Sequence, residues 1–271
     1  MELRRVRKRC VAIILFVFAV MAPAAAFAGA WTLPEGTGQW LASLTAASST
    51  EYFDGSGLAS TPRYDKLEAQ FLMEYGLTDR LTAIVDPGFQ HIDIAAPTDA
   101  SRTGLGYAEF GARYEFLESD SWVFSGQATL RLPGTTDTTN PAAIGYTDVE
   151  ADVRALIGHN FTLGSMPAFV DLEVAQRERS DGLPSEFRTD ATLGVKVLPQ
   201  WLLLAQSFNV VSEGAGNTLY TGGSYEYYKL QLSAVYSLTP TWELQGGGYT
   251  TYAGRNALQE NGLIFGVWHQ F

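Results

Sequence analysis

The sequence is poor in cysteine, in histidine and in basic residues. Its 271 residues include one cysteine, three histidines, and 18 lysines and arginines against 29 acidic residues. A single thiol, Cys10, excludes an internal disulfide and a multi-cysteine zinc site, and we expect no metal and no cofactor. The acidic excess gives the chain no electrostatic reason to bind nucleic acid, so we expect no nucleic-acid partner.

The N-terminus has the three parts of a secretory signal. A basic block at 4–9 precedes an apolar run at 11–21, and Ala26-Phe27-Ala28 is a small-x-small cleavage site. The apolar run is too short to cross a bilayer as a helix. We expect cleavage after Ala28, with cleavage after Ala30 as the alternative.

Cleavage after Ala28 divides the chain into a signal peptide at 1–28 and a single mature domain at 29–271. The signal takes five basic residues and one acidic residue with it, so the domain keeps 13 basic and 28 acidic residues and has no cysteine. The domain carries a formal net charge of about −15. Secretion also indicates that the protein acts outside the cytoplasm.

Alternation of polar and apolar residues runs through the whole mature domain. It predicts about twelve strands, most of them about 11 to 14 residues long, which is enough to cross a bilayer at the tilt of a barrel strand. They are expected at 38–50, 63–76, 80–92, 104–116, 121–132, 147–158, 166–178, 186–197, 201–211, 221–236, 241–252 and 261–271. No part of the domain has convincing helical periodicity.

One face of these strands is charged and the other is apolar. In 147–158, for example, Glu150, Asp152 and Arg154 alternate with Val149, Ala151 and Val153. Charged groups at the bilayer midplane are costly, so they are expected to face a lumen. The predicted lumen-lining residues are Lys66, Glu68, Glu74, Asp86, Glu109, Arg113, Glu115, Arg131, Asp148, Glu150, Asp152, Arg154, Asp171, Glu173, Arg177, Arg188, Asp190, Lys196, Lys229 and Glu243.

The connections between strands alternate in length. Short turns are expected near 76–79, 117–120, 198–200 and 237–240, with a longer one at 159–165; loops are expected at 51–62, 93–103, 133–146, 179–185, 212–220 and 253–260. Tight periplasmic turns and longer outer loops are typical of outer-membrane barrels. Aromatic residues beside the turns, Phe169 among them, predict an inner girdle, and Tyr64, Phe89, Tyr107, Phe187, Tyr225 and Tyr249 an outer one.

The last strand ends on an aromatic residue. Phe265, Val267 and Phe271 alternate with more polar positions, and this ending resembles the C-terminal signature of bacterial outer-membrane β-barrels, apart from His269. The resemblance implies that Phe265, Val267 and Phe271 form a signal for the barrel-assembly machinery. The expected fold is an all-β, single transmembrane antiparallel up-and-down β-barrel of about twelve strands in the bacterial outer membrane, surrounded by lipid.

The layout from Leu33-Pro34-Glu35-Gly36 to the C-terminus, with the turn Glu74-Tyr75-Gly76-Leu77-Thr78-Asp79-Arg80, is similar to small outer-membrane barrels grouped as transporters of the phenol-degradation MetA-pathway type. This resemblance implies uptake of small organic molecules. It supplies no ligand residues.

The sequence therefore predicts an outer-membrane channel or transporter that passes a small polar or aromatic solute without chemistry. A surface adhesin or a structural barrel with a plugged lumen is the alternative. A lipid-modifying enzyme is disfavoured, since His91, His159 and His269 have no serine or threonine two positions away to share their strand face. His91 and Asp93 share a face, but two ligands make a weak metal site.

Overall fold

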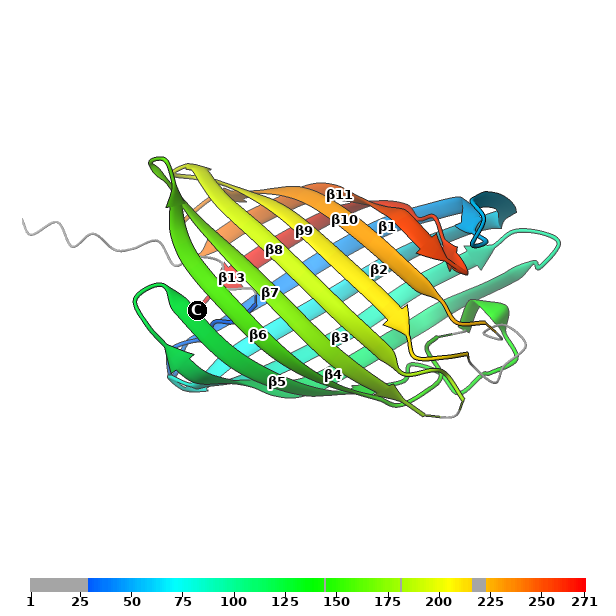
Figure 1. Ribbon diagram of the computed structural model, residues 1–271, viewed down its shortest axis with the longest axis horizontal. Helices are drawn as coiled ribbons and strands as arrows, with labels where there is room; N and C mark the ends of the chain where they lie inside the picture. Colours follow the sequence, from blue (N-terminus) through cyan, green and yellow to red (C-terminus); the bar gives the residue numbers. More distant parts are fainter. Residues whose placement is uncertain (1–28, 144, 181, 216–222) are drawn as a thin grey trace, which may run out of the picture.

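The chain folds into a closed antiparallel β-barrel of twelve up-and-down strands (Figure 1). The computed structural model describes residues 29–143, 145–180, 182–215 and 223–271, and the predicted signal peptide lies outside them. The predicted fold class is confirmed. Within the described residues, no helix is both long enough and apolar enough to cross a membrane.

The strands follow one another around the barrel in sequence order. Their bounds are β1 (Gly38–Phe53), β2 (Leu58–Thr78), β3 (Leu81–Ile94), β4 (Ala100–Glu118), β5 (Trp122–Leu132), β6 (Glu150–Leu163), β7 (Met166–Arg179), β8 (Glu186–Leu198), β9 (Trp201–Ser212), β10 (Glu226–Ser237), β11 (Trp242–Arg255), β12 (Ala257–Leu258) and β13 (Asn261–Gln270). Both β12 and β13 pair with β1, so together they make the twelfth strand.

Pairing of the first and last strands closes the barrel. The register between β1 and β13 runs from Gln39 opposite Gln270 to Ser48 opposite Asn261. Gly38 and Phe271 exchange two backbone hydrogen bonds of 2.8 and 2.9 Å. Closure leaves no unpaired strand edge, which an open sheet of this length would expose to other chains.

The two ends of the barrel differ. At the turn end, where the C-terminus lies, the connections are 79–80, 119–121, 164–165, 199–200 and 238–241. At the loop end they include 54–57, 95–99 and 133–149, the last containing the short 3₁₀ helix η1 (Pro141–Ala143). Strands β2 and β4 begin earlier than predicted and β6 ends later, so the loops expected at 51–62 and 93–103 and the turn expected at 159–165 are shorter than predicted.

The strand faces are sorted in the opposite sense to those of a soluble protein. Outward side chains are large and apolar: Leu263 is 71% exposed and Val153 is 63% exposed. Inward side chains include Glu150, Asp152 and Asp171, which are at most 2% exposed. An apolar belt around a polar interior is the arrangement that a barrel in lipid requires.

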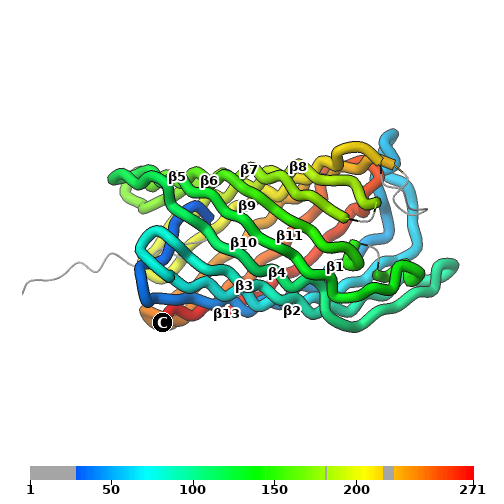
Figure 2. Tube along the Cα trace, turned by 90° about the horizontal axis from the view of Figure 1, so that it is seen from below, coloured from blue at the N-terminus to red at the C-terminus, as the bar shows by residue number. Residues whose placement is uncertain are grey.

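The N-terminal segment, residues 29–37, enters the barrel at the turn end. Its Ala30 is fully buried, and Trp31 packs edge-on against the Phe169 ring at 5.8 Å. The segment begins at the end of the molecule where the C-terminus is marked (Figure 2). Around it lies a small apolar core of inward side chains, made by Val123, Leu156, Phe169, Leu204, Val235 and Trp268. The prediction that Phe169 belongs to the inner girdle is wrong, because its ring faces the lumen and forms part of this core.

Candidate functional site

Charged side chains concentrate on one side of the lumen. The strand register puts the predicted lumen-lining residues that lie on strands, Glu74 of β2 and Arg131 of β5 among them, on the inward face of the barrel. Asp148 is the exception: it is buried in the loop before β6 and accepts a hydrogen bond from Thr147. Strands β4 to β8 carry most of these charges, whereas the inward face of β9 holds Leu202, Leu204, Gln206, Phe208 and Val210.

Acidic and basic groups interleave along the charged wall instead of facing each other across the lumen. Arg154 of β6 contacts Asp152 at 3.0 Å, Glu173 at 2.5 Å and Asp190 at 2.8 Å. Arg177 of β7 contacts Asp152 at 3.0 Å. The wall therefore neutralises its own charges from one strand to the next.

A chamber of about 380 Å³ lies above this network, toward the loop end. Four arginines and three glutamates line it, so guanidinium groups are in excess. Its lining residues are Glu68, Tyr107, Arg131, Gly145, Tyr146, Glu150, Arg177, Arg179, Leu183, Glu186, Arg188, Tyr225 and Tyr227. Arg179, Glu186 and Tyr107 are functional candidates that the sequence analysis does not place in the lumen.

Two carboxylates hold the arginines of the chamber in place. Glu150 is contacted by Arg179 at 2.7 Å, by Arg177 at 3.7 Å and, more closely, by Arg131. Glu186 is contacted by Arg179 at 3.3 Å and by Arg188 at 3.0 Å. Each carboxylate is thus shared among several guanidinium groups, which leaves N–H donors of the arginines available to a solute.

Tyrosines complete the chamber. The Tyr107 hydroxyl donates to Glu150 Oε1 at 2.9 Å, and the Tyr225 hydroxyl donates to Glu186 Oε1 at 2.5 Å. Burial, followed by the Glu186 charge, raises the pKa of Tyr225 above its ordinary value, and burial raises the pKa of Tyr146, so both phenols stay protonated. The prediction of the outer girdle is wrong for four of its tyrosines. The register and these contacts show that their side chains point into the lumen: Tyr64, Tyr107, Tyr225 and Tyr249.

The loop between β5 and β6 folds inward over the chamber. Ala142 and Ala143 of η1 are at most 2% exposed, and Asn140 Nδ2 donates to the Ser101 carbonyl at 3.1 Å. Tyr146 packs against Tyr107 with ring centroids 5.7 Å apart. The sequence leaves open whether this loop stands in solvent or narrows the lumen, and the described residues support the second alternative.

The N-terminal segment narrows the lumen at the turn end. Arg113 Nη1 donates to the Trp31 carbonyl at 3.0 Å, and Arg113 Nη2 pairs with Glu74 Oε1 at 2.9 Å. The Leu33 amide donates to Thr82 Oγ1 at 2.8 Å. The lumen thus has an outer chamber, a charged middle and an inner constriction, and no pattern in the sequence predicts the constriction.

A hydroxyl, an imidazole and a carboxylate meet on the outer face of the barrel. His91 Nδ1 lies 2.6 Å from Thr103 Oγ1, and His91 Nε2 lies 2.7 Å from Asp93 Oδ2. Thr103 stands opposite His91 on the neighbouring strand β4, where spacing along one strand could not reveal it. Acyl transfer also needs donors that stabilise an oxyanion, and Arg63 on the adjacent strand is already paired with Asp65 at 2.6 Å. We interpret the cluster as part of the polar rim.

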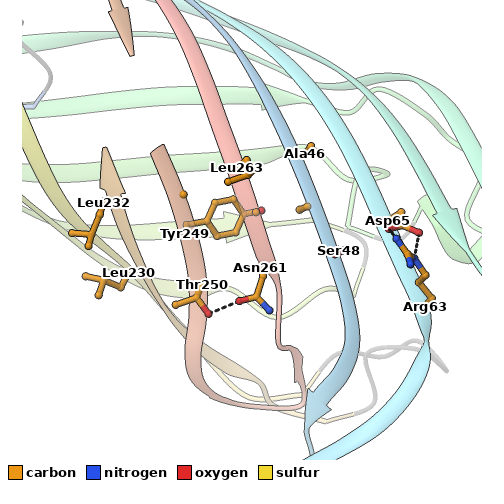
Figure 3. A pocket seen from close by; sticks show the side chains of 13 residues that line it. Ala46, Ser48, Arg63, Asp65, Leu230, Leu232, Tyr249, Thr250, Asn261 and Leu263 are labelled. Carbon is orange, nitrogen blue, oxygen red and sulfur yellow. Dashed lines mark hydrogen bonds and ion pairs between the residues drawn. The ribbon is translucent and has the colours of Figure 1, made fainter. Parts of the chain in front are cut away.

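A second cavity, of about 630 Å³, is a groove on the outside of the wall (Figure 3). The small residues Ala46, Ser48 and Gly248 make the depression, and Leu232 and Leu263 border it. These side chains belong to the apolar outward face. Although this groove is larger than the chamber, it faces the lipid and lies outside any path through the barrel.

No known protein-family model and no curated protein sequence matches the chain. Solved structures do resemble it. An outer membrane channel from Pseudomonas putida F1 is 17% identical, with a TM-score of 0.75 over 89% of this chain and 98% of that one. The NanC porin is 9% identical, with a TM-score of 0.54 over 84% and 98%.

The β domain of the Bordetella autotransporter BrkA is 15% identical, with a TM-score of 0.54 over 87% of this chain and 99% of that one. The chain has the fold of an outer-membrane β-barrel. The predicted resemblance to small bacterial outer-membrane barrels is thereby confirmed at the level of the fold. At these identities the likeness extends to the fold alone, so the function must be argued from the lumen.

Proposed function

We propose that the protein is a passive channel or transporter in the bacterial outer membrane for a small polar or aromatic solute. The similar structures from P. putida and of NanC are described as a channel and a porin, which supports this role. The apolar outer face supports a location in lipid, with the C-terminal strand read by the barrel-assembly machinery. We propose no chemical step.

The outer chamber carries the proposal. A volume of about 380 Å³ suits a molecule of the size of one substituted aromatic ring. Its tyrosine rings offer faces for stacking, and its excess of guanidinium groups offers paired N–H donors to an anion. We therefore infer that the preferred solutes carry an acidic group, although the mature chain as a whole is strongly acidic.

Buried polar groups without a protein partner support a hydrated lumen. Both amide atoms of Gln90 on β3, and Thr251 Oγ1 on β11, lack a hydrogen-bond partner among the described residues. Buried polar groups of this kind are normally satisfied, and water is the available partner here. Water in the lumen is what passage of a polar solute requires.

A structural barrel with a closed lumen is the second candidate. The N-terminal segment favours it, because this segment fills the turn end with Trp31 and is held by several hydrogen bonds. Transport through the lumen then requires that the segment moves. The two candidates differ in whether the refolded barrel conducts at all.

Ion selectivity in planar bilayers tests the proposal. We expect the mature protein to conduct with a preference for anions, and Arg179→Gln with Arg188→Gln to lower the anion-to-cation permeability ratio by about threefold. Arg255→Gln is the matched control, because Arg255 lies near the same end but is 46% exposed and 3.9 Å from Glu226. A barrel that is folded but silent, or one whose selectivity ignores the chamber variants, would contradict the proposal.

A further inference from the structure

The buried carboxylate of Asp171 lies beside the first described residue of the chain. Asp171, on β7, is 1% exposed, and its Oδ2 accepts a hydrogen bond of 2.7 Å from the Ala30 amide. Among the described residues, no lysine, arginine or histidine forms a salt bridge with it. The Glu173 carboxyl group also lies against it. A buried carboxylate with a second acidic group beside it and one neutral N–H donor is poorly compensated, so a nearby cation would stabilise its ionised form.

Gly29 is the residue nearest to supply that cation. A Cβ atom at position 29 would overlap all three atoms of the Asp171 carboxyl group. The Gly29 nitrogen is only two bonds from that Cβ position, which puts it in the immediate surroundings of the carboxylate. Glycine is also suited to this place by its φ of +107°.

Cleavage of the signal peptide would turn this nitrogen into a cation. Ala26-Phe27-Ala28 is a signal-peptidase site. Hydrolysis of the Ala28–Gly29 peptide bond by water leaves a carboxylate on Ala28 and an ammonium group on Gly29. Cleavage after Ala30 would instead remove the residue whose amide binds Asp171 and whose carbonyl accepts from Ser125.

We propose that signal cleavage after Ala28 creates the ligand of Asp171: the new α-ammonium group of Gly29 forms an ion pair with this carboxylate inside the lumen. Processing thereby anchors the N-terminal segment in the barrel. Asp171 is a receptor for the processed N-terminus, and Gly29 is required because any side chain there would displace the carboxylate.

Amine reactivity tests the pair without reference to transport. Mature protein is purified from membranes, its N-terminus is read by mass spectrometry, and the folded barrel is treated with an acetylating reagent that attacks neutral amines. We expect an N-terminus at Gly29 whose acetylation is at least about tenfold slower than in Asp171→Asn, because a buried ion pair holds the amine protonated. Asp171→Asn keeps an acceptor for the Ala30 amide. Asp65→Asn, which changes an exposed carboxylate, is the matched control and should leave the acetylation rate unchanged.

A double-mutant cycle supplies the second measurement. Protein beginning at Gly29 is refolded with its N-terminus either free or chemically acetylated, and each form is prepared with and without the Asp171→Asn substitution. We expect Asp171→Asn to lower thermal stability in the free protein and to leave it equal or higher in the acetylated one. An N-terminus at Trp31, equal acetylation rates, or additive effects in the cycle would each overturn the proposal.

Discussion

At the residue scale, Arg113 joins the barrel wall to the N-terminal segment. It is 6% exposed, pairs with Glu74, and donates to the Trp31 carbonyl. It also donates to Gln127 Oε1 at 3.0 Å. One guanidinium therefore satisfies groups on two strands and on the inserted segment, because arginine carries several N–H donors in a fixed planar fork.

Replacement of Arg113 by methionine should destabilise the barrel by about 3 kcal/mol, because it leaves the Glu74 carboxylate buried without its charged partner. Unfolding in detergent, followed by the heat-dependent shift of the barrel on a gel, measures this loss. The double variant Arg113→Met with Glu74→Leu should recover much of it. Arg255→Gln, at the exposed pair with Glu226, should change nothing. A single variant as stable as the parent would show that the pair does not hold the segment.

At the element scale, residues 29–37 control the inner end of the lumen. They make no strand pairing along most of their length and are held by side chains of the wall, Thr82 and Arg113 among them. Hydrogen bonds and the packing of Trp31 hold the segment in place, and strand pairing does not. The segment is therefore the part of the lumen that can be removed without breaking a pair of strands.

Deletion of residues 29–36 should raise single-channel conductance by about threefold or more while the barrel still folds, because the hydrogen bonds that pair the strands with one another do not involve the segment. The measurement is conductance of refolded protein in planar bilayers, with circular dichroism as the control for folding. The matched control is deletion of residues 135–139 at the loop end, which removes no part of the inner constriction. It should change the ion selectivity and should not raise the conductance as the first deletion does. Unchanged conductance after the first deletion would mean that the narrowest point lies elsewhere.

The sequence predicts the strands well because each one alternates between lipid and lumen. Glu150, Asp152 and Arg154 of β6 share one strand face by this period of two, and Glu150 and Asp152 are buried. Strand ends differ more from the prediction: β6 begins at Glu150 and not at residue 147, which leaves Asp148 in the preceding loop. Polar and apolar residues continue to alternate across the start of β6, so no local feature of the sequence marks where the strand begins.

Features that depend on contacts between distant residues could not be predicted. Thr103 meets His91 only through the pairing of β3 with β4. Trp31 meets Phe169 across 138 positions of sequence, in a segment too short and irregular for any periodicity. Residue type alone places Tyr107 and Tyr225 in a girdle, but each hydroxyl has a buried carboxylate partner, and this partner decides its direction.

At the scale of the whole molecule, closure between β1 and β13 makes the other features possible. Without it, the lumen charges would be exposed on an open sheet and both edges would be free to aggregate. Gly38 is important at this seam, since a Cβ atom there would overlap the Phe271 ring. The seam thus has room for the terminal aromatic residue only because its partner on β1 lacks a side chain.

Phe271→Ala should reduce assembly in cells more than folding in vitro. The Phe271 ring is 52% exposed and lies on the outer face, so its loss removes little packing, and its backbone hydrogen bonds to Gly38 persist in the variant. We expect the amount of barrel in outer-membrane fractions to fall by about tenfold, while refolding into detergent stays near the parent level. Gly38→Val is the contrasting variant, because it obstructs the seam itself and should impair refolding in vitro as well. If Phe271→Ala fails equally in both settings, the terminal residue acts in closure of the barrel and not as a signal to the assembly machinery.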